Sequence, residues 1–229
     1  MLFAAILFDC DGVLVDSEIV GLEDVAVFLN ERGFDWGPED LIRRFNGMRA
    51  DLFRTALQDE YGAVLGRMPS EAEFTSLWDG MIETRRAQRH TMTIVPGALD
   101  VVQTARELGY RMAVASSSAQ IYLDDKVNRY GLAPYFDGHV YSADFVEHGK
   151  PAPDIFLYAA EQLGVDPASC LIIEDSAHGV AAGKAAGGTV WGFLGGGHCL
   201  EDHADQLQEA GADRLIETHS ELAIALRML

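Results

Sequence analysis

The chain has 229 residues, of which 48% are hydrophobic and 23% are charged, a composition typical of one large domain or of a core domain with a smaller insert. Its formal net charge of −19 disfavours nucleic acids and anionic membranes as partners, so any phosphate site must be made positive locally by a metal ion and a few basic side chains. The cysteines Cys10, Cys170 and Cys199 form no CxxC pair, so we expect no disulfide framework, no zinc site and a location in the reducing cytoplasm.

An apolar run occupies residues 2–8 and ends at Asp9. It has no basic flank and is too short for a signal peptide or a membrane span, so it predicts a buried strand. A continuous apolar run, without alternation, is typical of a strand covered on both faces in a parallel sheet. Similar runs predict further strands at 110–115, 138–141, 170–174, 188–194 and 213–216.

Helical patterns separate these runs in the second part of the chain, and several of them end at a glycine, a common helix stop. They cover residues 97–108, 119–130, 153–164, 177–186, 201–210 and 219–228. Strands that alternate with helices predict an α/β fold, with a doubly wound, Rossmann-like parallel sheet.

Residues 17–92 follow a different pattern, with predicted helices at about 17–32, 38–46, 49–61 and 70–89 and no convincing strand. An all-helical block between the first strand and the later strand–helix series is typical of an inserted domain. We therefore expect a discontinuous α/β catalytic core of residues 1–16 and 93–229, with a helical cap of residues 17–92.

Polar side chains with phosphoryl-transfer chemistry follow four of the predicted strands. The sequence has DCDG at 9–12, SSS at 116–118, GKP at 149–151 and EDS at 174–176. Because ligands of open parallel sheets bind at the carboxyl ends of the strands, we expect these groups to lie together. Each group also has an ordinary structural explanation, as a turn, a helix cap or a surface lysine, but the combination favours one site.

A carboxylate such as Asp9 can attack phosphorus and form an acyl phosphate, which divides a difficult hydrolysis into two easier steps. An anion that attacks an anionic phosphate needs a hard cation with oxygen ligands, a role for which Mg²⁺ is suited. Asp9 and Asp175 could supply carboxylate ligands and Asp11 its main-chain carbonyl, while Glu174 would orient a metal-bound water from outside the ligand set.

Asp11 follows Asp9 by two residues and is expected to point to the same side of an extended segment. There it could protonate the leaving oxygen and later activate water. Lys150 could neutralise phosphate charge, while the Ser116 hydroxyl and the Ser117 amide could hold phosphate oxygens.

The motifs DCDGVLVDS at 9–17, SSS at 116–118, GKPAPDIF at 149–156 and EDSAHG at 174–179 together resemble the four motifs of the haloacid dehalogenase superfamily. The helical insert resembles the branch that contains β-phosphoglucomutase, phosphoglycolate phosphatase and sugar-phosphate phosphatases. The resemblance implies the same site as the chemistry above and, by analogy, a monomer. The founding dehalogenases lack an aspartate at the position of Asp11, so its presence implies phosphate esters as substrates.

The predicted cap contains an arginine-rich stretch around FNGM at 45–48. In the mutase-like branch this stretch closes over the substrate, so Gly47 and Arg49 are candidate substrate contacts. Arg49 lies two residues after Gly47, whereas the mutase pattern has its arginine three residues after, where this chain has Ala50. This departure favours a phosphatase over a mutase, and a solvated helix face explains the arginines equally well.

Three other patterns are set aside. The stretch 179–184 is one residue short of a P-loop, and its small residues suit close helix packing. The sequence also has no GxSxG elbow, the nucleophile motif of serine hydrolases. The GGGH stretch at 195–198 predicts a flexible loop, and His198 and His203 have no recognisable metal-ligand spacing. The sequence therefore predicts a Mg²⁺-dependent phosphatase for a small phosphorylated metabolite. A phosphomutase and a binding protein with a vestigial site are the alternatives.

Overall fold

The computed structural model describes residues 2–45 and 50–229. The described residues divide into two compact units, which fall in the ranges Met1–Ser17 with Thr93–Leu229 and Glu18–Met92. Within the described ranges, no helix is both long enough and apolar enough to cross a membrane.

The larger unit is built on a six-stranded sheet in the order β5-β4-β1-β6-β7-β8, in which every pair of neighbours is parallel. Its strands are β1 (Ala5–Phe8), β4 (Arg111–Ser116), β5 (Val140–Ser142), β6 (Cys170–Glu174), β7 (Thr189–Phe193) and β8 (Arg214–Ile216). All residues of the central strands β1 and β6 are buried, as expected for strands covered on both faces. The predicted doubly wound α/β sheet is therefore confirmed.

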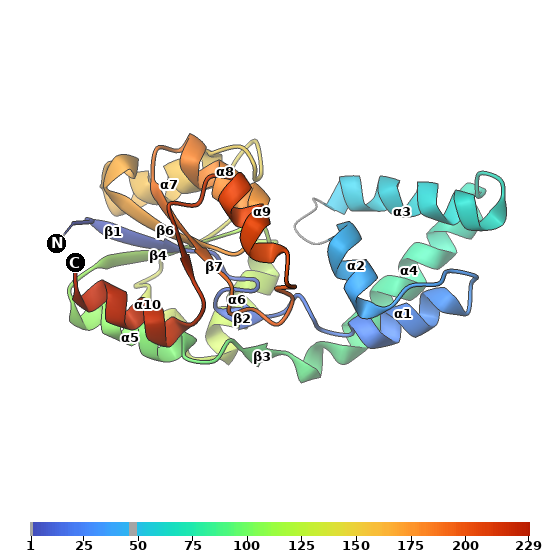
Figure 1. Ribbon diagram of the computed structural model, residues 1–229, viewed down its shortest axis with the longest axis horizontal. Coiled ribbons are helices and arrows are strands. Elements are labelled where there is room, and N and C mark those ends of the chain that lie inside the picture. The colour runs from blue at the N-terminus through green and yellow to red at the C-terminus, as the bar shows by residue number, and fades with distance from the viewer. Residues whose placement is uncertain (1, 46–49) are drawn as a thin grey trace. The chain divides into compact units, whose positions relative to one another are not determined.

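Helices cover both faces of this sheet. Figure 1 shows α5 and α10 side by side on one face, and α7 and α8 on the other. The helices of this unit are α5 (Ala98–Glu107), α6 (Gln120–Arg129), α7 (Asp154–Leu163), α8 (Ala177–Ala185), α9 (His203–Glu209) and α10 (His219–Arg227). Short 3-10 turns lie at Ala133–Tyr135, Ala143–Phe145 and Pro167–Ser169.

The glycines of α8 allow it to pack closely on the sheet. A Cβ at Gly183 would lie 2.7 Å from Val190 Cγ2 and 3.0 Å from Ile172 Cδ1, closer than packed carbon atoms approach. The P-loop-like composition of 179–184 therefore serves helix packing at this position.

A second, two-stranded sheet was not predicted. It pairs β2 (Val15–Asp16) with β3 (Thr93–Ile94) in antiparallel register, Val15 opposite Ile94. Two residues are too few to show any periodicity, so the sequence pattern carries no signal for these strands.

In its described residues the smaller unit has four helices, α1 (Leu22–Asn30), α2 (Pro38–Phe45), α3 (Ala50–Leu65) and α4 (Glu71–Ala87), followed by a 3-10 turn at Gln88–Thr91. Its core contains Leu29, Leu57, Leu77 and Met81 among its buried side chains. The start of α4 is fixed by a capping box between Ser70 and Glu73.

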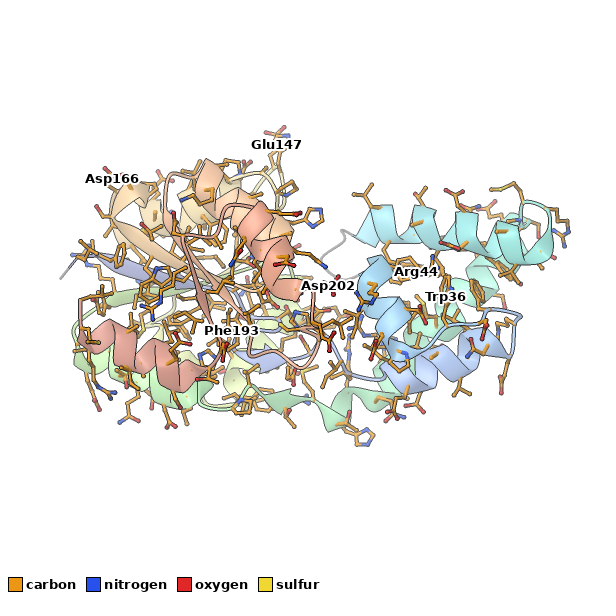
Figure 2. The ribbon with its side chains drawn as sticks, in the orientation of Figure 1. Trp36, Arg44, Glu147, Asp166, Phe193 and Asp202 are labelled. Atoms are coloured by element: carbon orange, nitrogen blue, oxygen red, sulfur yellow. The ribbon has the colours of Figure 1, made fainter. Side chains whose placement is uncertain are left out.

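Aromatic side chains extend this core to the surface of the smaller unit. The guanidinium of Arg44 lies 4.8 Å from the ring centroid of Trp36, and Figure 2 labels both residues.

The first helix of the smaller unit, α1, begins at Leu22, later than the predicted residue 17. The preceding residue, Gly21, has the left-handed backbone conformation.

Candidate active site

The carboxyl ends of adjacent strands bring the predicted site residues together. Asp9 directly follows β1, and its amide donates to the main-chain oxygen of Ile173 in β6 at 2.9 Å. Ser116 ends β4, and Glu174 ends β6. Since β4 and β6 flank β1, these residues lie at one edge of the sheet.

Lys150 lies at the centre of this group and is 7% exposed. Its ammonium donates to Asp9 Oδ1 at 2.5 Å, to the Ala115 main-chain oxygen at 3.0 Å and to the Glu174 carboxylate. Burial by itself would lower the pKa of Lys150, but the negative charges of Asp9 and Glu174 outweigh burial and raise that pKa above its ordinary value. The lysine is therefore a buried cation shared by two carboxylates.

Burial raises the pKa of Asp9 well above its ordinary value, and Lys150 offsets this only in part, because Glu174 and Asp175 add negative charge nearby. A further cation beside Asp9 would favour its charged form. The donors at this position are the carboxylates of Asp9 and Asp175, hard oxygen ligands of the kind that Mg²⁺ prefers. The residues present therefore fit the predicted metal ion.

Glu174 is wholly buried and has two sets of partners. One oxygen accepts from Lys150, and the other accepts from the amide and hydroxyl of Ser176, each at 3.1 Å. It therefore orients Lys150 and the start of α8, a function that its position in the sequence did not indicate.

Asp11 makes a separate cluster of contacts. Its carboxylate accepts from Lys126, from Ser17, from Ser118 Oγ at 2.7 Å and from Ser116 Oγ at 3.3 Å. Burial would raise the pKa of Asp11, but Lys126 and the two closer hydroxyls lower it to about 2. Asp11 is therefore ionised in this arrangement, which is the form that a general base requires.

Lys126 is a contact that sequence analysis missed. It is the seventh residue of α6, a position at which a lysine is usually a solvated surface residue. Only the approach of α6 to the loop after β1 brings its ammonium to Asp11, and no local pattern predicts this.

The three serines at the end of β4, Ser116, Ser117 and Ser118, differ in their surroundings. Ser116 is wholly buried and accepts from the Ser118 amide at 3.0 Å, while Ser117 is exposed. The sequence also allowed an ordinary structural explanation, in which these serines cap the following helix. That explanation is wrong. The N-cap of α6 is Ala119, and the Gln120 amide donates to Asp144 Oδ2 at 2.8 Å instead.

Asp175 and Gly12 are in close contact. A Cβ on Gly12 would lie 1.9 Å from Asp175 Oδ2, and Gly12 has φ +79°, so only glycine fits there. Asp175 Oδ2 also lies 3.0 Å from His198 Nε2. Burial would lower the pKa of His198, but the bond to Asp175 outweighs burial and raises it to about 11.

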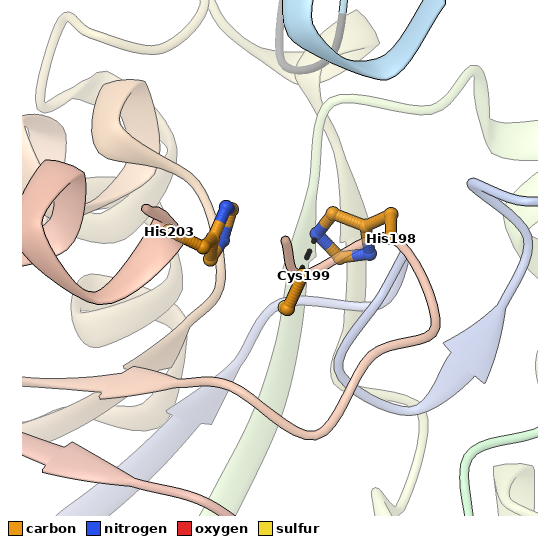
Figure 3. A group of neighbouring side chains, drawn as sticks. All are labelled: His198, Cys199 and His203. Atoms are coloured by element: carbon orange, nitrogen blue, oxygen red, sulfur yellow. Dashed lines mark hydrogen bonds between the residues drawn. The ribbon is translucent and has the colours of Figure 1, made fainter. Parts of the chain in front are cut away.

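His198, Cys199 and His203 form a cluster that sequence analysis did not anticipate (Figure 3). One potential ligand atom of each lies within 4.8 Å of the others, and His198 is wholly buried. The 195–198 stretch is a loop, as predicted, but the structure brings His198 close to Cys199 and His203, a grouping that their spacing in the sequence does not indicate. Spacing alone did not reveal the cluster, because the fold of the loop and the start of α9 bring the side chains together.

The candidate substrate contacts Gly47 and Arg49 lie outside the described residues. Two nearby arginines are engaged within the smaller unit. Arg44 pairs with Glu60, and Arg54 lies 5.2 Å and 5.3 Å from the ring centroids of Phe74 and Trp78.

The chain is similar to proteins of known structure over almost its whole length. A haloacid dehalogenase-like protein from Agrobacterium tumefaciens is 34% identical, with a TM-score of 0.85, and the match covers 99% of this chain and 98% of that one. A haloacid dehalogenase family hydrolase from Deinococcus radiodurans is also 34% identical, with a TM-score of 0.83 and coverage of 99% and 96%.

Fructose-1-phosphate phosphatase YqaB from Escherichia coli is 31% identical over 81% of this chain and 93% of its own length. The chain spans only 47% and 17% of two longer Arabidopsis thaliana relatives that it also matches. The family described as haloacid dehalogenase-like hydrolase matches residues 3–187. The chain therefore belongs to the haloacid dehalogenase-like hydrolases.

Proposed function

We propose that this protein is a Mg²⁺-dependent phosphatase that hydrolyses a small phosphorylated metabolite, a sugar phosphate, through an aspartyl phosphate on Asp9. The observation that carries the proposal is a buried ion pair at the carboxyl end of β1, in which the Lys150 Nζ lies 2.5 Å from Asp9 Oδ1. It places a nucleophilic oxygen beside a fixed positive charge, which attack on an anionic phosphate requires.

The first step forms a bond between an Asp9 oxygen and phosphorus and breaks the bond to the substrate oxygen, which leaves with a proton from Asp11. A bound phosphate dianion is a like charge near Asp11, so it raises the pKa of that group from about 2 and favours the protonated form. Lys150 offsets the charge on the phosphate, and Ser116 and Ser117 are proposed to hold its oxygens.

In the second step Asp11 removes a proton from water, which attacks phosphorus and releases Asp9 and inorganic phosphate. When bound, Mg²⁺ would be held by the carboxylates of Asp9 and Asp175 and by the main-chain carbonyl of Asp11, and it would supply the positive charge that two anions need to approach each other. Glu174 acts through Lys150, whose ammonium it fixes.

The relatives support the substrate class. Besides the fructose-1-phosphate phosphatase, a 6-phosphogluconate phosphatase and a hexitol phosphatase from Escherichia coli match the chain at 27% and 29% identity. The Deinococcus radiodurans relative was crystallised with bound phosphate and sodium. We propose that the helical unit, residues 18–92, acts as the cap that excludes water and selects the substrate, with Gly47 and Arg49 among its contacts.

Phosphate release from a panel of phosphorylated sugars and sugar acids, measured with and without Mg²⁺, tests the proposal. We expect release that requires Mg²⁺ and falls at least about 1,000-fold in Asp9→Asn, because loss of a nucleophile removes the covalent step. Asp100→Asn, an exposed aspartate on α5, is the matched control and should retain activity. Equal activity of Asp9→Asn and the wild type would contradict the proposal.

A phosphomutase is the second candidate, because a structure described as a putative β-phosphoglucomutase from Thermotoga maritima is 28% identical with a TM-score of 0.75. The two functions differ in whether the aspartyl phosphate is passed to water or to a sugar hydroxyl. Conversion of a sugar 1-phosphate to the 6-phosphate without net phosphate release would favour the mutase. Phosphate binding without either reaction would favour a non-catalytic protein.

A further inference from the structure

The loop between β7 and α9 lies against the loop that follows β1. The Gly197 amide donates to Asp16 Oδ1 at 3.1 Å. A Cβ at Gly196 would lie 2.7 Å from the main-chain oxygen of Gly12, so the two backbones are in direct contact. The side chains that this loop directs inwards are therefore fixed relative to Asp9 and Asp11.

His198 is the wholly buried side chain of this loop and fits tightly between the two backbones. Its Cε1 lies 2.5 Å from a hypothetical Cβ on Gly12 and 2.7 Å from one on Gly196, so glycine at both positions makes room for the ring. Nε2 is directed at Asp175 Oδ2, 3.0 Å away. The imidazole therefore restrains the carboxylate of Asp175 from the side of the Asp9–Gly12 loop.

His203 contacts the main chain of Asp175. Its Nε2 donates to the Asp175 carbonyl oxygen at 2.5 Å, and the residue is 6% exposed. The two imidazoles are perpendicular, with ring centroids 5.2 Å apart, and the Cys199 sulfur lies 3.7 Å from His198 Nε2 (Figure 3). One residue, Asp175, thus has its side chain and its backbone each fixed by a buried histidine.

We infer that His198 and His203 are positioning residues that hold Asp175 in the geometry required of a metal ligand. The inference rests on the proposed function, in which Asp175 binds Mg²⁺. Partners outside the ligand set orient metal-binding carboxylates, and their loss weakens metal affinity by about 10- to 100-fold. A role in packing alone would not explain why both histidines contact this one aspartate through polar atoms.

His219 provides a matched control for the loss of a buried histidine. It is 1% exposed, its Nε2 lies 2.7 Å from the main-chain oxygen of Val13 and its ring stacks on Phe193, and neither partner is a proposed metal ligand. Replacement of His219 should therefore reduce stability without weakening metal binding.

The test is a titration of the whole protein with Mn²⁺, followed by electron paramagnetic resonance without substrate. Mn²⁺ prefers oxygen ligands, as Mg²⁺ does, and its free form is directly observed. We expect His198→Ala to weaken Mn²⁺ binding about 10- to 100-fold, His198→Gln to restore part of it through a donor near the position of Nε2, and His219→Ala to bind like the wild type. His203→Leu should weaken binding and His203→Gln should restore part of it.

The variant Asp175→Asn distinguishes the positioning role of the two histidines from the assignment of Asp175 as a metal ligand. If this variant loses Mn²⁺ binding while folded His198→Ala and His203→Leu bind as the wild type does, the positioning inference is overturned and the metal assignment stands. If Asp175→Asn itself binds Mn²⁺ like the wild type, the metal assignment fails and the inference fails with it. Circular dichroism shows which variants are folded. Should His198→Ala or His203→Leu fail to fold, His198→Met and His203→Met, whose longer side chains fill the space without donating a hydrogen bond, provide the same comparison.

Discussion

Lys126 and Asp11 are joined across 115 residues of sequence, and their ion pair sets the protonation state of the proposed acid/base. The motif that contains Asp11 predicts its role, but the low pKa depends on a lysine from α6 and on Ser17 and Ser118. The resting site is therefore set for the base step, and the acid step depends on the charge of the bound phosphate.

Replacement of Lys126 by Met should raise the pKa of Asp11. Removal of the cation leaves the effect of burial, which favours the neutral form, so the pKa rises from about 2 to at least its ordinary value of about 3.9. Ionised Asp11 is required in the second step, so where hydrolysis of the aspartyl phosphate limits turnover, the acid limb of the kcat profile moves to higher pH by about 2 units or more. Profiles of the wild type and of Arg129→Met, an exposed cation on the same helix, provide the comparison. An unshifted limb in the Lys126 variant would contradict this account of Asp11.

His219 should make the protein less stable in mild acid. Burial lowers its pKa to about 4, below the ordinary value of about 6.5, so the unfolded chain binds the proton first as the pH falls. The stabilisation is complete above about pH 6.5 and is lost as the pH falls towards 4, about 3 kcal/mol in total. Urea unfolding at pH 7 and pH 4.5 should show this loss reduced in His219→Gln. The same pH dependence in both proteins would show that His219 does not cause it.

The long elements were predictable because their signals are local. The apolar runs at 170–174 and 188–194 correspond to β6 and β7, and the catalytic motifs could be placed because each directly follows a buried strand. Elements with weak local signals were missed. The two-residue strands β2 and β3 have no pattern, and they pair across 79 residues of sequence, from Val15 to Ile94.

At the site, too, residues with a local sequence signal could be predicted and residues without one could not. Asp9, Lys150 and Glu174 were predicted from strand ends, and Lys150 contacts both carboxylates. Lys126, His198 and His203 were not, because they come from a helix face and from a loop whose approach depends on the packed fold. Residues in motifs could be predicted, whereas residues that support them from neighbouring elements could not.

Packing of α8 on the sheet gives a prediction for Gly183→Ala. Alanine favours a helix by about 1 kcal/mol, but its Cβ would meet Val190 at 2.7 Å, and overpacking of this kind costs about 1–3 kcal/mol. We expect the urea midpoint of unfolding to fall. Gly62→Ala in α3, where the nearest atom is the flexible Met68 sulfur at 3.3 Å, is the control and should leave the midpoint unchanged or higher. A higher urea midpoint for Gly183→Ala would show that the sheet side chains Val190 and Ile172 move to accommodate the added methyl group.

The whole molecule carries a net charge of −19, whereas the proposed site depends on Lys126 and Lys150. The acidic surface repels an anionic substrate at long range, and the two lysines attract it only at short range. Salt screens charges beyond about 8 Å at physiological ionic strength, so it weakens the repulsion more than the local attraction.

We therefore expect kcat/KM for a phosphorylated sugar to rise several-fold between about 10 mM and 150 mM salt at saturating Mg²⁺. The measurement is initial phosphate release at low substrate concentration, with kcat at saturating substrate as the control that salt should leave unchanged. A decrease of kcat/KM with salt would show that the local positive charge dominates the approach of the substrate.

The central claim, a covalent intermediate on Asp9, is tested most directly by rapid acid quench of the enzyme with a substrate labelled with ³²P in its phosphate. We predict label on the wild-type protein that hydroxylamine removes, as expected of an acyl phosphate. Asp9→Asn should carry none. Substrate turnover without protein-bound label, or label retained by Asp9→Asn, would contradict the account.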